Sequence, residues 1–218
     1  MRTHSRRGVS SIEFAFSTLV MVPLLLGTGA LGINMIRELQ VVQLSRDAGH
    51  MYARGVDFAL PGNQTILANL GKDVGLSTTP AQSSAVVIFS SITYIDKAAC
   101  AAVGAVDASG NPTAACTNYT KWVFAQRLTV GNTAIHTSNF GTPSGVTIGS
   151  DGKISALDQA TKAGDVATLS GVNPYSVVNG VASGLPSGQV LYLAEAAASG
   201  FNMPPFVSNA VMYEFGFF

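Results

Sequence analysis

The sequence RRGVSSIEF at residues 6–14 leads into an apolar segment, 14–36, that contains no charged residue. As an α-helix these 23 residues would be about 35 Å long, enough to cross a hydrocarbon core of about 30 Å. Glu13 stands at the head of this segment, where an ionised carboxylate is costly unless it finds a partner. Arg2, Arg6 and Arg7 place the N-terminus in the cytoplasm and everything after residue 36 outside.

Two ordinary alternatives remain for this segment. It exceeds the usual apolar core of a secretory signal peptide, about 7–15 residues, and no small-x-small cleavage site before a clear mature start is obvious. Ala30, Gly32 and Asn34 nevertheless leave a cleaved signal peptide open. A plain single-pass anchor is the other alternative.

The short basic leader, Gly8, Val9 and the Glu13–Phe14 pair resemble the type IV prepilin signal. Residues 5–55 more closely resemble the TadE-like pseudopilins of the tight-adherence (Flp) pili of bacteria. The resemblance implies that a prepilin peptidase cuts after Gly8, so that the mature chain begins at Val9 and Glu13 is its fifth residue. The commonest type IV pilins begin with Phe instead, which favours the pseudopilin resemblance over the classical one.

The same resemblance implies a role in assembly. Glu13 is expected to pair with the free amino group of Val9 in a neighbouring subunit, since two charges near lipid offset each other's desolvation only by coming together. Partners would be the peptidase, other pilin subunits and the inner membrane, with an extracellular pilus as the destination. Three alternatives remain: a major structural pilin, a signal-anchored envelope protein with a binding or enzymatic outer domain, and a Glu13 that is merely hydrated at the cytoplasmic interface.

Inside the apolar segment, Pro23 and three glycines, Gly27, Gly29 and Gly32, weaken the helix. Proline removes a backbone hydrogen bond, and each glycine lowers helix propensity by about 1 kcal/mol. We hypothesise that this stretch loosens when a subunit leaves the membrane for a filament. The glycines also match the dinucleotide fingerprint G-x-G-x-x-G, but they lack the preceding strand and the acidic residue that such a site needs.

Charge is divided unevenly along the chain. Residues 1–54 carry a net charge of +3, and residues 55–218 carry −3. Loss of the leader, residues 1–8, would leave the mature chain at about −3, which excludes a basic nucleic-acid-binding face.

Beyond the membrane, residues 37–58 are predicted to continue the helix in amphipathic form. One side carries Leu39, Val42, Met51 and Tyr52. A turn is predicted at residues 60–63.

Residues 59–218 are predicted to form an extracytoplasmic α+β domain. A short helix is expected at 64–75, followed by an antiparallel sheet of about four strands. The strands are predicted at residues 85–95, 119–130, 189–198 and 206–217. Residues 132–188 are interpreted as an inserted, exposed region with a small hairpin at 146–154 and a helical turn at 174–178.

The two cysteines, Cys100 and Cys116, lie in a predicted loop, 96–118. In an extracytoplasmic compartment an isolated pair is most simply a disulfide, and closing a loop of this size would contribute about 3 kcal/mol. Free thiols and metal ligands are the alternatives, although three histidines provide no recognisable zinc spacing.

The sequence indicates no catalytic, metal-binding or cofactor-binding constellation. Glu195 and Glu214 are interpreted as polar positions of half-exposed strands. The segment 107–111 has oxygen ligands in a turn but lacks the number and spacing of a calcium loop. The C-terminal aromatic residues are expected in the core of the sheet, with docking of a neighbouring subunit as the alternative; they are Tyr213, Phe215, Phe217 and Phe218.

Overall fold

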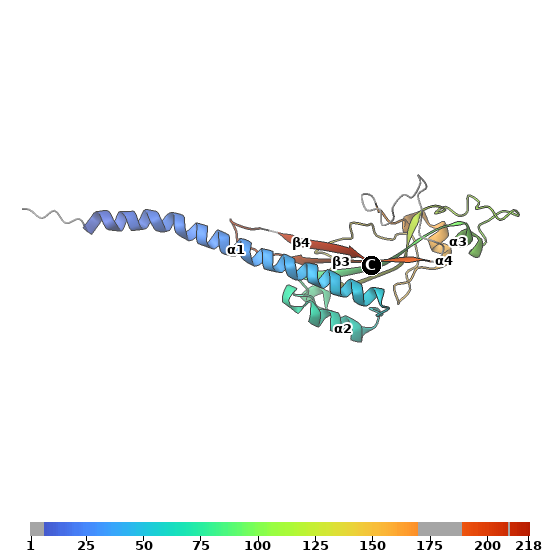
Figure 1. The fold of residues 1–218 in the computed structure, drawn as a ribbon, viewed down its shortest axis with the longest axis horizontal. Helices are drawn as coiled ribbons and strands as arrows, with labels where there is room; N and C mark the ends of the chain where they lie inside the picture. Colours follow the sequence, from blue (N-terminus) through green and yellow to red (C-terminus); the bar gives the residue numbers. More distant parts are fainter. Residues whose placement is uncertain (1–6, 170–188, 209) are drawn as a thin grey trace, which may run out of the picture.

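The computed structural model describes residues 7–169, 189–208 and 210–218, which form one long helix and a four-stranded antiparallel sheet. The helix α1 spans Arg7–Ala53 without interruption. Its N-terminal half projects beyond the sheet, and its C-terminal half lies along it (Figure 1). The predicted α+β class, a long helix followed by an antiparallel sheet, is confirmed.

The two threonines in the apolar half of α1 are satisfied within the helix. The hydroxyls of Thr18 and Thr28 donate to the carbonyls of Phe14 and Leu24, at 3.0 and 2.9 Å. These bonds satisfy the two threonine hydroxyls without a partner outside the helix. After the last helical residue, Ala53, the chain turns at Gly55, whose φ of 87° favours glycine and lets the N–H of Val56 reach the carbonyl of Met51 at 3.0 Å.

The C-terminal half of α1 packs against the sheet through one stripe of residues. This stripe consists of Val41, Leu44, Ser45, Ala48 and Tyr52. Leu39, predicted on the same side as Tyr52, does not belong to this stripe, because it lies about 200° around the helix from Val41 and is 64% exposed. Tyr52 does belong to it and is buried.

Short elements connect α1 to the sheet and cover its ends. The predicted turn at 60–63 is instead the first turn of a helix, since Pro61 suits the first helical position. The elements after α1 are α2 (Pro61–Leu70), η1 (Lys72–Val74), η2 (Pro80–Gln82), β1 (Ala85–Tyr94), α3 (Lys97–Ala102), β2 (Trp122–Gly131), α4 (Ala156–Thr161), η3 (Ala163–Asp165), β3 (Val190–Ser199) and β4 (Val211–Phe217).

The strand order is β2-β1-β3-β4, with every neighbouring pair antiparallel. We call the side of the sheet that packs on α1 the helix face. There Phe89 of β1 lies between Leu128 and Ala194, and stacks on Phe58 at a ring distance of 4.3 Å. The small side chains of β3 on this face let α1 approach closely, and Ser45 donates to the carbonyl of Ala194 at 3.3 Å.

A β-bulge in β2 changes which side chains share a face. Ser91 pairs with Gln126 and Ile92 pairs with Phe124, so Ala125 is the extra residue. Strict alternation from 119 to 130 would separate Phe124 from Arg127. The bulge instead brings both to the opposite side, the outer face, with Arg127 4.4 Å from the centre of the Phe124 ring.

The described part of the region 132–188 packs on this outer face rather than standing exposed. Phe140, Ile154 and Ala167 are buried there against Phe124. The predicted hairpin is present as a bridge between Ile148 and Ile154. The predicted helical turn at 174–178 lies outside the described residues.

Candidate functional site

The apolar half of α1 is the largest exposed hydrophobic surface of the described chain. Phe14 is 71% exposed, Phe16 is 70% and Leu25 is 69%. By length and composition, this part of α1 could cross a membrane. So much apolar surface is unfavourable in water and indicates a contact with lipid or with other helices.

The residues of the predicted cleavage and assembly motif lie at the start of this surface. Gly8 and Val9 belong to the first turn of α1, and Glu13 follows Val9 by four residues, on the same side of the helix. The carboxylate of Glu13 is exposed, and within the described part of the chain no ion pair reaches it. The isolated chain therefore presents Glu13 and Phe14 to its surroundings.

The proposed loosening residues have different environments. A side chain at Gly29 or Gly32 would meet open space, whereas one at Gly27 would lie 3.3 Å from the ring of Phe206. The helix is regular through Pro23 in the isolated chain. Loosening in a filament stays a prediction.

The predicted disulfide between Cys100 and Cys116 is confirmed, with an S–S distance of 2.01 Å. Cys100 lies in the short helix α3, which Asp96 caps by accepting from the N–H of Ala99 at 2.8 Å. Both sulfurs are buried beside Val123 of β2. The bond closes the excursion 96–118 on itself, and the packing of both cysteines on Val123 holds it against β2.

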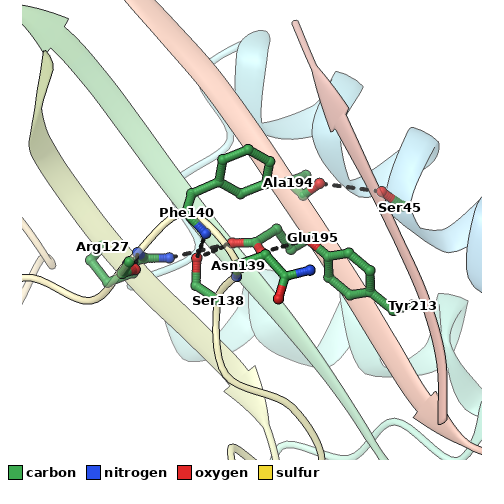
Figure 2. Close-up of polar contacts among 9 residues, drawn as sticks. Ser45, Arg127, Ser138, Asn139, Phe140, Ala194, Glu195 and Tyr213 are labelled. Carbon is green, nitrogen blue, oxygen red and sulfur yellow. Dashed lines mark hydrogen bonds and ion pairs between the residues drawn. The ribbon is translucent and has the colours of Figure 1, made fainter. Parts of the chain in front are cut away.

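A buried carboxylate on β3 is the main polar feature of the outer face (Figure 2). Glu195 is 1% exposed. Its oxygens accept from the hydroxyl of Ser138 at 2.5 Å, the N–H of Asn139 at 3.0 Å and the hydroxyl of Tyr213 at 2.8 Å. Arg127 of β2 completes the set, with Nη1 3.6 Å from Oε2. The expectation of a half-exposed Glu195 is therefore wrong.

We call Glu195 and the residues bound to it the Glu195 cluster. Burial and charge pairing change the pKa values of its members. Burial, together with the negative charge of Glu195, raises the pKa of Tyr213, so its hydroxyl stays a donor. Burial lowers the pKa of Arg127, while the same carboxylate opposes that shift. Arg127 also donates to the carbonyl of Gly141. The carboxylate of Glu195 thus binds three donors and one cation, which is the arrangement of a structural cluster.

The neighbouring cavity has a volume of about 170 Å³ and is lined by threonines, Arg127 and His136. The hydroxyl of Ser138 donates to Glu195 and not to His136, whose Nε2 has no hydrogen-bond partner in the described part of the chain. The arrangement does not form a nucleophile–base pair. Among the described residues, no group of three or more His, Cys, Asp or Glu side chains could hold a metal ion.

The other predicted residues are dispersed. Asp107 accepts from the N–H groups of Ser109 and Asn111, so its carboxylate shapes a turn. Glu214 pairs with Ala196 and is half-buried on the helix face, whereas Glu195 lies on the outer face. Phe215 and Phe217 pack on Phe140 of the outer face.

The C-terminal residue packs on α1 instead. The ring of Phe218 lies over Gly49, where any side chain would clash with it.

Asp165 is a second buried carboxylate, and in the described part of the chain neither of its oxygens has a hydrogen-bond partner. Burial and the nearby charge of Asp158 raise its pKa to about 7. The folded state thus holds a proton that the unfolded state, with a pKa of about 4, releases. Stability should fall as pH rises from about 4 to 7.

We therefore expect Asp165→Asn to raise the free energy of unfolding at about pH 8 by up to about 4 kcal/mol, and to change it little near pH 4. Urea unfolding of the full chain in detergent, followed by the fluorescence of Trp122, measures this. Trp122 is the only tryptophan of the sequence. Asp73→Asn, at an exposed site, is the control. Equal gains at both pH values would contradict the prediction.

Searches of protein families, curated proteins and solved structures found no match to this chain.

Proposed function

We propose that this chain is a pilin-like subunit of the TadE-like class, cut by a prepilin peptidase between Gly8 and Val9. The mature subunit joins a tight-adherence pilus or assists its assembly. The observation that carries the proposal is the division of α1 into an exposed apolar half and a half packed on an antiparallel sheet. Such a helix can pack against sister helices while its domain stays outside the helix bundle.

The proposal assigns a physical role to the two ends of the exposed half. Before assembly, the segment 14–36 holds the subunit in the inner membrane with the disulfide-bonded domain on the extracytoplasmic side. Cleavage creates an ammonium group at Val9 close to a membrane surface. Glu13 of a neighbouring subunit neutralises it, and the exposed residues around Phe14 and Phe16 exchange lipid for helix contacts.

Maturation is the first step to test. We expect the wild-type chain, recovered from cells and from sheared surface filaments, to begin at Val9. Gly8→Leu should leave the chain uncut, because the bulky side chain stands at the bond to be cleaved. Gly62→Leu, which introduces the same side chain into open space on α2, should be cut normally. Intact-mass and N-terminal analysis measures both.

The same samples separate the alternatives. A wild-type chain that still begins at Met1 would indicate a plain anchor. A chain cut beyond residue 30 would indicate a secreted domain. For a chain that begins at Val9, its abundance in filaments relative to other subunits would distinguish a shaft subunit from a minor one.

A further inference from the structure

The loop between β3 and β4 reaches back along α1 into the apolar segment. In Figure 1 it extends from the sheet beside the helix, toward the helix's free half. At the base of the loop, Nη1 of Arg37 donates to the carbonyl of Ser199 at 2.9 Å. Farther along the loop, the ring of Phe206 packs on Gly27. Between these contacts Ala30 is only 2% exposed.

We propose that the tip of this loop, residues 200–208, inserts into the hydrocarbon region of the bilayer that α1 crosses, and so contacts lipid acyl chains beside the helix. The proposal rests on the membrane anchoring assigned to the segment 14–36 above. It adds a second membrane contact, made by the outer domain itself.

The position of Phe206 along α1 places it inside the hydrocarbon region. The longest uncharged stretch of α1 lies between Glu13 and Arg37, and a core of about 30 Å uses about 20 of these 23 residues. The outer boundary of the core therefore falls at about residues 33–36. Gly27 lies some 6–9 residues inside that boundary, which places the ring of Phe206 about 9–14 Å below it.

The chemistry of the loop suits this environment. No charged residue occurs between Glu195 and Glu214. Pro204, Pro205 and Phe206 are exposed at the tip, and Phe206 is 39% exposed although it rests on the helix. On α1, Arg37 marks the end of the uncharged segment at the level of the loop's base, where a long cationic side chain can reach the interface.

Several backbone groups of the loop are already hydrogen-bonded. This suits a lipid environment, where an unpaired N–H or C=O is costly. Asn34, the one amide side chain in the apolar segment, donates to the carbonyl of Phe201 at 3.3 Å and accepts from its N–H at 2.7 Å. The N–H groups of Met203, Phe206 and Val207 bond within the loop. The two prolines have no N–H group.

The test uses the full chain in vesicles of phosphatidylcholine and phosphatidylglycerol. Because the described chain has no free cysteine, a thiol-reactive fluorophore reports on one introduced cysteine at a time. Phe206→Cys and Pro204→Cys place it at the tip, and the second variant keeps the Phe206–Gly27 contact. Leu25→Cys marks the helix, and Ser109→Cys marks the exposed turn after Asp107.

We expect nitroxide groups on the acyl chains to remove most of the fluorescence at the tip and at Leu25, and aqueous iodide to remove it only at Ser109. If Leu25 responds to the nitroxide while both tip probes respond to iodide, the loop lies in water, and this proposal fails while the anchor stands. Tip probes shielded from both quenchers would mean that protein, such as a second copy, covers the loop, which also overturns it. If Leu25 itself escapes the nitroxide, the anchor and the proposed function fail together.

Discussion

Replacing Glu195 with Gln is expected to lower the free energy of unfolding by about 3–5 kcal/mol, because it leaves Arg127 buried without its counter-charge. Arg127 and Glu195 expose only 8% and 1% of their side chains, so water cannot take over the lost interaction. The amide is also mismatched to its partners. Ser138, Asn139 and Tyr213 all donate to the carboxylate, and one half of an amide is itself a donor.

Urea unfolding followed by Trp122 measures this loss. Glu214→Gln makes the same change on the neighbouring strand at a half-buried position, and should stay within about 0.5–1 kcal/mol of the wild type. In the double variant Glu195→Gln/Arg127→Met, both charges are absent and much of the loss should be recovered. A single variant as stable as the wild type, or a double variant that simply sums the two losses, would show that the pair is not coupled.

The elements that could be predicted are those whose signal is local. The helix α1 follows from the apolar run 14–36 and its amphipathic continuation, and the four strands follow from runs rich in apolar residues. The disulfide follows from a single isolated pair of cysteines. Such signals depend on neighbours in the sequence, so the tertiary structure only adjusts the ends of these elements.

The contacts that could not be predicted join distant parts of the chain. Glu195 is flanked by alanines, and nothing near it indicates that Arg127, 68 residues earlier, lies on the same face. That placement depends on β1 lying between the two strands and on the bulge at Ala125. Likewise, the sequence shows Asn34 only as a polar residue within an apolar segment. The structure shows that it binds the backbone of Phe201 in the loop between β3 and β4.

The candidate assembly residues divide in the same way. Gly8, Val9 and Glu13 are identified by a local motif, and the structure adds that Glu13 is exposed and available for a partner. Gly27 is different, because its contact with Phe206 supplies a packing reason for a glycine that the sequence alone assigned to loosening of the helix. A side chain at Gly29 or Gly32 would instead meet open space.

Replacing Glu13 with Gln is expected to leave cleavage after Gly8 intact and to reduce incorporation into filaments about a hundredfold or more. The ammonium group of Val9 in the next subunit would then enter an apolar bundle without a counter-charge. Breaking a buried pair in this way costs about 3 kcal/mol or more, which corresponds to that factor. The amide keeps the size and shape of the side chain, so packing around Phe14 is preserved and the lost charge is the only large change.

Glu38→Gln is the matched control, since it makes the same substitution on α1 at an exposed position beyond the apolar segment. It should leave both cleavage and assembly unchanged. Mass analysis of the membrane pool and quantification of the chain in sheared filaments give the two readouts separately. If Glu13→Gln enters filaments as well as Glu38→Gln does, the carboxylate is only a hydrated group at the interface, and assembly depends on the apolar surface of α1 alone. If neither variant is cut, cleavage of the leader has failed for a reason other than the loss of the Glu13 pair. The role of Glu13 must then be measured on a chain that begins at Val9.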